Sequence, residues 1–143
     1  MKIIVDKIDE HPGHALSRAD VRLILSTVPV AWSEHIKVVR LSSSRSAASV
    51  ALYAHSVKTL TIASRDRTPG TTLHCLLAEL VAHALGFKHR TFQHLQARYH
   101  ARVESLVAPL MDELLPRLSP VRSAARISRD WGAESSGDSQ RPL

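Results

Sequence analysis

The chain has 143 residues, enough for one domain with a buried core and too few for two domains of ordinary size. Hydrophobic residues make up 44% of the sequence and aromatic residues only 4%, so the chain is expected to fold around a core of aliphatic side chains rather than to remain disordered. The 19 basic and 13 acidic residues give a net charge of +6 at pH 7, which excludes a strongly acidic protein.

The positive charge is compatible with binding to nucleic acid or other anions. However, the arginines are scattered along the chain, and few aromatic side chains are available to stack on bases. We therefore expect nucleic-acid binding to be weak and nonspecific. A small basic nucleic-acid-binding protein remains one alternative for the function.

The single cysteine, Cys75, cannot form a disulfide within the chain, which fits a reducing compartment. Its position beside a leucine-rich stripe predicts a buried, inert thiol. The N-terminal residues lack the apolar run of a signal peptide, and no stretch is long enough to span a membrane. A cytoplasmic protein without a membrane partner is the expectation.

The first part of the chain predicts a strand followed by a helix. Lys2 to Ile8 is rich in β-branched residues, and Pro12 and Gly13 mark a turn after it. Ser17 is a suitable N-cap for the helix, and Pro29 ends it. The hydrophobic positions at helical spacing are Val21, Leu25 and Val28.

The middle of the chain predicts three strands. The first is His35 to Leu41, and the small polar residues Ser42 to Ser49 form a loop after it. The segment from Val50 to Ser64 reads as two strands around a turn at Ser56 to Lys58. The second of these, Thr59 to Ala63, is the clearer one because hydrophobic residues and threonines alternate in it.

A long helix is predicted next. Thr68 can cap it, Pro69 suits its first position, and the helix is expected to reach Leu85 and to stop at Gly86. Its hydrophobic stripe comprises Leu73, Leu76, Leu77, Leu80, Val81 and Ala84.

The last helix is expected to start near Thr91, and Pro109 within it should kink or split it. Its hydrophobic side comprises Phe92, Leu95, Tyr99, Leu106, Leu110 and Leu114. After Ser119 the pattern fails and small polar and charged residues dominate, so residues 120–143 are expected to form a disordered tail. Residues 1–119 are expected to form a small α+β domain.

The long central helix carries candidate metal ligands. Glu79 and His83 are four residues apart and therefore adjacent on one strip of the helix, whereas His74 projects from roughly the opposite side. His89 follows the Gly86 turn, where the chain can fold back toward the pair. A carboxylate and two imidazoles suit zinc, and they suit iron or manganese as well. The alternative is an exposed Glu79–His83 helix pair with His89 as a surface residue.

The segment HALGFKH, His83 to His89, resembles the second half of the zincin metallopeptidase motif HExxHxxGxxH. GFKHRTF also resembles the third-ligand region of SprT-like and other small zincins. The order of helix, strands, an edge strand such as TLTIAS, loop and active-site helix is similar to that of minimal zincins. The resemblance covers roughly Ser17 to Leu118. It implies a zincin-like fold with a short mixed sheet, an active-site-type helix and a long C-terminal helix, and zinc as the cofactor.

The sequence departs from the motif at two positions. Glu79 stands where the family has its first histidine, and Leu80 stands where it has its catalytic glutamate. Glu79 can replace a histidine as a ligand, but Leu80 cannot accept a proton, so ordinary peptide hydrolysis is not expected. Glu104, on the last helix, is the candidate for an unusual base.

The resemblance thus implies a degenerate zincin-like protein that binds a divalent metal through Glu79, His83 and His89 and has weak or no peptidase activity. Its scaffold would then serve an unidentified protein or peptide partner. The first alternative is an active metal-dependent hydrolase with an unusual Glu-His-His site. The second is a small basic protein that binds nucleic acid.

Overall fold

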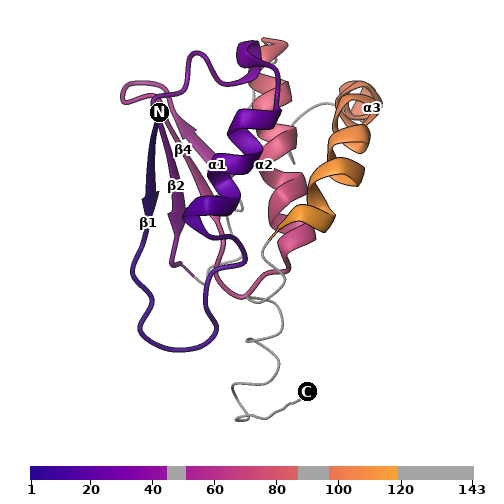
Figure 1. Cartoon of the computed structure of the whole chain (residues 1–143). Helices are drawn as coiled ribbons and strands as arrows, with labels where there is room; N and C mark the ends of the chain where they lie inside the picture. Colours follow the sequence, from indigo (N-terminus) through magenta and orange to yellow (C-terminus); the bar gives the residue numbers. More distant parts are fainter. Residues whose placement is uncertain (45–50, 87–96, 119–143) are drawn as a thin grey trace.

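A computed structural model of the chain describes residues 1–44, 51–86 and 97–118 (Figure 1). In these ranges the order is strand, helix, three strands, helix, helix, as the sequence predicts. The strands are β1 (Lys2–Val5), β2 (Val38–Ser42), β3 (Ala51–Ala54) and β4 (Thr59–Ala63). The helices are α1 (Arg18–Thr27), α2 (Pro69–Ala84) and α3 (Ala97–Leu114), with short 3-10 helices η1 (Val30–Trp32) and η3 (Leu115–Arg117).

The four strands form one mixed sheet in the order β1-β2-β4-β3. β1, β2 and β4 are parallel, and β3 runs antiparallel to β4 at the edge. The expectation that TLTIAS forms an edge strand is therefore wrong. β4 lies between two strands and buries Leu60 and Ile62 completely, whereas the preceding segment forms the edge as the other arm of the hairpin.

The register of the sheet places two rows of side chains toward the helices. One row is Ile3, Val39, Leu60 and Tyr53, and the other is Val5, Leu41, Ile62 and Ala51. Because side chains alternate across a strand, Arg40 and Thr61 belong to the opposite, more exposed face. The sheet thus buries one face only.

The capping of α1 follows the sequence prediction. The Ser17 hydroxyl accepts a hydrogen bond from the Asp20 backbone N–H at 3.0 Å, and the Asp20 carboxylate accepts one from the Ser17 N–H at 2.9 Å. Leu25, expected on the buried side, is only partly buried, because Ile24 takes that place. The buried hydrophobic residues in and after α1 are Val21, Ile24 and Val28.

The ends of α2 are also as predicted. The Thr68 hydroxyl accepts a hydrogen bond from the Thr71 N–H at 3.1 Å, Pro69 is the first helical residue, and Gly86 follows the helix with a positive φ of 78°. Ala84 is exposed, contrary to its expected place in the stripe. The rest of that stripe, Leu73, Leu76, Leu77, Leu80 and Val81, is fully buried.

The predicted hydrophobic side of α3 is confirmed in part. Leu114 is fully buried, and Tyr99 and Leu110 are partly buried against the core. Leu106 is 38% exposed, and Val103 and Val107 are buried instead. Pro109 lies within α3, which continues past it to Leu114, so the expected split does not occur. The expected helix start near Thr91, with Phe92 and Leu95, and the predicted tail lie outside the described residues.

The described elements form three layers (Figure 1). α1 and α2 cover one face of the sheet, and α3 packs against the far side of α2. α2 is therefore buried on two sides, which explains why its sequence is rich in leucine around most of its circumference.

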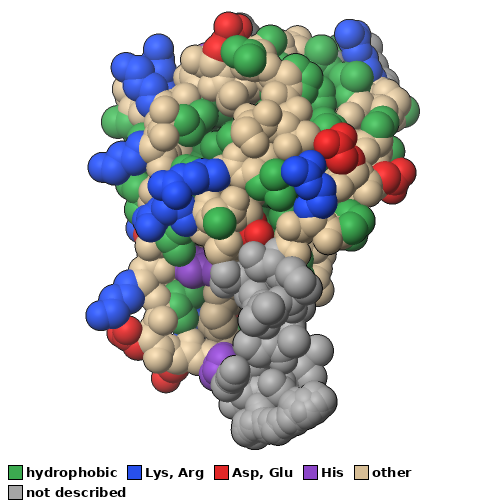
Figure 2. Space-filling model, viewed as in Figure 1, with side chains coloured by type: hydrophobic (Ala, Val, Ile, Leu, Met, Phe, Trp, Pro, Cys, Tyr) green, Lys and Arg blue, Asp and Glu red, His purple; other side chains and the backbone are tan. Residues whose placement is uncertain are grey.

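Among the described residues, no helix has the length and apolar character needed to cross a bilayer. On the face that Figure 2 shows, Lys and Arg side chains lie at several separate places, with Asp and Glu side chains at others.

Candidate functional site

Glu79 and His83 lie together in the interior of the protein, in the C-terminal half of α2. The Glu79 side chain is 0% exposed and that of His83 is 6% exposed. His83 Nε2 is 3.4 Å from Glu79 Oε1. The alternative of an exposed Glu79–His83 helix pair is therefore wrong. The physical reason is that the sheet and α3 cover α2 from two sides. They bury side chains that helical periodicity alone would leave in solvent.

Three further rings surround His83. The ring centre of His83 is 4.7 Å from that of Tyr53, 6.2 Å from that of His35 and 6.2 Å from that of His55. Tyr53 also contacts His55 at 4.7 Å and His35 at 6.1 Å, both edge to face. We call these four residues, the three histidines and Tyr53, the imidazole cluster.

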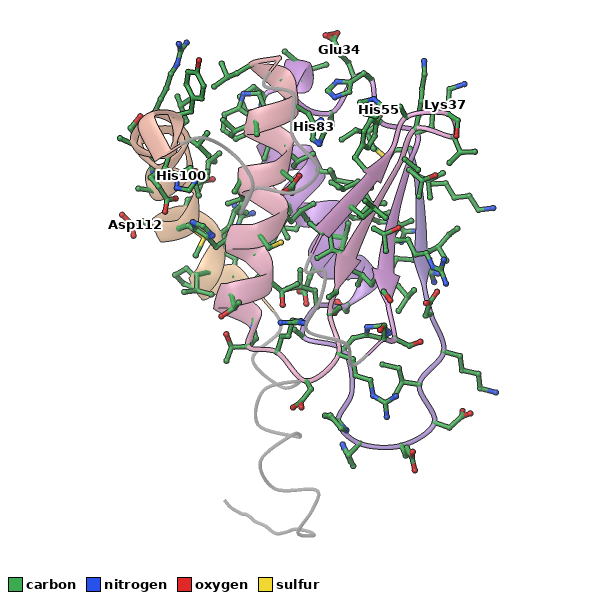
Figure 3. All side chains as sticks on the ribbon, turned by 180° about the vertical axis from the view of Figure 1, so that it is seen from behind. Glu34, Lys37, His55, His83, His100 and Asp112 are labelled. Carbon is green, nitrogen blue, oxygen red and sulfur yellow. The ribbon has the colours of Figure 1, made fainter. Side chains whose placement is uncertain are left out.

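The imidazole cluster joins three separate segments at one end of the molecule. Tyr53 belongs to the row of the edge strand that faces the helices, and His55 follows two residues later, after the end of β3. His35 precedes β2. Figure 3 shows His83 on α2 and His55 at the adjacent end of the sheet, with His100 on the other side of α2.

Tyr53 also fixes the backbone beside the cluster. Its hydroxyl donates a hydrogen bond to the carbonyl oxygen of His35 at 3.3 Å. Burial raises the pKa of Tyr53, so the phenol keeps its proton at neutral pH. Burial, together with the neighbouring His83, lowers the pKa of His35 and favours its neutral imidazole, the form that binds metals.

The separation of the Glu79 and His83 atoms suits two ligands of one metal ion. A charge-assisted N–H···O hydrogen bond spans about 2.7–2.9 Å. Two donors bound to a tetrahedral zinc ion, each at about 2.0–2.1 Å, lie about 3.3 Å apart. The observed 3.4 Å matches the second value. A carboxylate oxygen and an imidazole nitrogen are also donors that zinc, iron and manganese accept.

The described side chains do not form a complete metal site in the observed conformation. Within residues 1–44, 51–86 and 97–118, no three His, Cys, Asp or Glu side chains converge closely enough to hold a metal ion. His89, the third predicted ligand, lies outside the described residues. Glu79 and His83 are therefore the two predicted ligands that the structure brings together.

Glu104, the candidate for an unusual base, is engaged elsewhere in the structure. The Glu104 carboxylate lies 2.6 Å from His74 Nε2, on the α3 side of α2. Leu80, at the position of the family's catalytic glutamate, is fully buried in the core. Neither Leu80 nor Glu104 thus supplies a base beside Glu79 and His83.

Cys75 is only partly buried, although the sequence predicts a buried thiol, and it packs against the core. Burial and the nearby Glu79 carboxylate raise its pKa to about 12, although Arg67 acts in the opposite direction. The reactive thiolate is therefore suppressed at neutral pH.

The sequence interpretation missed His35, Tyr53 and His55. A weak signal for two of them exists, because Tyr53 and His55 are two residues apart and alternation places such residues on one face of a strand. That signal does not show which strand lies next to α2. The pairing of β3 with β4 at the sheet edge is what brings them to His83.

The chain matches no known family model, no curated protein sequence and no solved structure. Its functional assignment therefore rests on the arrangement of its own residues.

Proposed function

We propose that this protein has a zincin-like scaffold that binds a divalent transition metal, zinc in the first place, and that it has weak or no peptidase activity. The observation that carries the proposal is the buried pair of Glu79 Oε1 and His83 Nε2 at 3.4 Å. Its separation suits two ligands of one ion, and its donors suit zinc.

The resemblance in the segment His83 to His89 supports the same proposal. The order of the elements and the short mixed sheet beside the ligand-bearing helix agree with it as well. His89 is proposed as a further ligand on the motif alone.

The proposal assigns binding rather than catalysis to the site. A bound metal supplies Lewis-acid chemistry, that is, it polarises a carbonyl group. Peptide hydrolysis also needs a group that takes up a proton, and Leu80 cannot do so while Glu104 is engaged with His74. An active hydrolase remains the alternative, and its base would have to be a group other than Leu80 or Glu104. Nucleic-acid binding rests on the net charge of +6 alone, since the arginines are scattered along the chain.

Metal content and zinc-dependent stability test the proposal. Protein purified without a tag should contain about one zinc ion per chain, or take up one, and zinc should raise its melting temperature by mass action. His83→Ala should abolish the rise, and His11→Ala, which removes an exposed imidazole in the loop between β1 and α1, should retain it. Failure of the wild-type chain to bind zinc or to be stabilised by it would overturn the proposal. Zinc-dependent cleavage of casein by the wild-type chain would favour the active hydrolase instead.

A further inference from the structure

Among the described residues, Glu79 and His83 supply fewer ligands than a zinc site needs. Catalytic zinc sites have three protein ligands and structural sites have four. In the described residues, the imidazoles that contact His83 belong to His35 and His55, both with ring centres 6.2 Å away. Both come from the sheet side of the site, which the zincin resemblance does not assign to metal binding.

We infer that His55 is a metal ligand, so that the site is formed jointly by α2 and the end of the edge strand. This inference rests on the proposed function, because it concerns the same ion as Glu79 and His83. It adds a ligand that the zincin motif does not contain.

His55 and His83 need only a short movement of one ring to bind the same metal ion. With Zn–N bonds of about 2.0–2.1 Å and tetrahedral angles, the centres of two imidazole rings on one ion lie about 5 Å apart. His55 and His83 are at 6.2 Å, so one ring must approach the other by about 1 Å. A change between side-chain rotamers moves an imidazole ring by at least this much.

His55 has the freedom to make this movement, and His35 has less. His55 is exposed and lies directly after β3, in the turn that leads to β4. His35 is partly buried, and the Tyr53 hydroxyl holds its carbonyl oxygen. Rotation of an exposed ring disrupts little packing, whereas rotation of an enclosed ring displaces its neighbours.

Tyr53 acts as a positioning residue for the inferred ligand. Its ring centre is 4.7 Å from the centres of both His55 and His83, and it meets the His55 ring edge to face at 83°. Such an aromatic contact restrains the imidazole on the side facing α2. Tyr53 itself is anchored in the buried row of the sheet, where it is paired with Leu60.

Zinc affinity of the full-length chain, measured by competition with a chromophoric chelator, tests the inference. His55→Ala should weaken zinc binding by more than about 100-fold, because loss of a ligand exceeds the roughly 10- to 100-fold effect commonly seen for residues that only support ligands. His11→Ala is the matched control, since it also removes one exposed imidazole. Visible absorption of the Co²⁺-loaded protein gives a second readout, and its bands should shift in His55→Ala but not in His11→Ala. Melting temperatures of the metal-free variants verify that both fold.

The outcomes separate the two proposals. Zinc binding by the wild-type chain that is lost in His83→Ala but unchanged in His55→Ala would overturn the inference and leave the proposed function standing. The same holds if His35→Ala, rather than His55→Ala, causes the loss. No zinc binding by the wild-type chain would overturn both. Weakened binding with shifted Co²⁺ bands in His55→Ala alone supports the inference.

Discussion

Leu80 and Glu79 are neighbours in the chain, and both occupy the buried surface of α2. Leu80 packs in the hydrophobic core, and Glu79 is equally inaccessible although it is ionisable. Burial of a carboxylate is unfavourable unless a cation or hydrogen-bond donor accompanies it, and the His83 imidazole lies 3.4 Å away. The proposed metal site offers a physical reason for keeping a carboxylate at this depth.

Leu80→Ala should lower the free energy of unfolding by about 2–5 kcal/mol, because it removes a fully buried side chain and leaves a cavity. Urea denaturation of the metal-free protein measures the change. Leu106→Ala is the control, since Leu106 is 38% exposed and should cost much less. Equal, small losses in the two variants would mean that Leu80 faces a cleft, as the catalytic position of a zincin does.

Among the elements, β1 and β2 are tied together by one acidic side chain. Asp6 accepts two hydrogen bonds from the Arg40 guanidinium, both at 2.8 Å, and one from the Ser43 backbone N–H at 3.2 Å. These contacts hold the end of β1 against the end of β2. The Arg40 side chain is 48% exposed and that of Asp6 is 16% exposed, so solvent screens part of the attraction.

Asp6→Asn should therefore lower the free energy of unfolding by about 1 kcal/mol at pH 7. The hydrogen bond and charge of Arg40 lower the pKa of Asp6 below 3.8, despite an opposing effect of burial. A lowered pKa in the folded state means that the stabilisation is complete above pH 3.8 and is lost as the pH falls through the folded-state pKa.

Denaturation of both proteins between pH 7 and pH 2 measures this effect. The difference between wild type and Asp6→Asn should narrow in the acid range. Asp9→Asn is the control, because Asp9 forms only an exposed pair with Lys7 at 3.6 Å. A difference between wild type and Asp6→Asn that stays constant down to pH 2 would contradict the assigned role of the carboxylate.

On the scale of the whole molecule, the core lies between one face of the sheet and the helices α1 and α2, and α3 completes the cover of α2 (Figure 1). The hydrophobic core cluster extends from Leu16 near the start of α1 to Leu118 after η3. The chain up to this residue thus contains all the packed elements that the structure describes.

Deletion of residues 120–143 should leave the melting temperature nearly unchanged. This prediction rests on composition, since these residues lie outside the described ranges, and their few hydrophobic side chains bury too little surface to offset the entropy of ordering. Differential scanning calorimetry of the two proteins provides the comparison. A decrease of many degrees in the shortened chain would show that the deleted segment packs on the domain.

The sequence by itself determined the features that depend on neighbours in the chain. Ser17 and Thr68 cap their helices, and Gly86 takes the positive φ after α2, because each effect acts within one turn of backbone. The order of strands and helices followed from local periodicity in the same way. The pairing of Glu79 with His83 was predictable because residues four apart meet on a helix.

Only the tertiary structure decided what depends on distant segments. The edge position of β3 results from strand pairing, which the hydrophobic pattern of a single strand does not specify. Glu79 is buried because the sheet and α3 enclose α2 from two sides, and no periodicity within α2 encodes both neighbours. His35 and His55 reach His83 for the same reason, since residues about 20 to 50 positions apart in the chain become neighbours only when the layers pack.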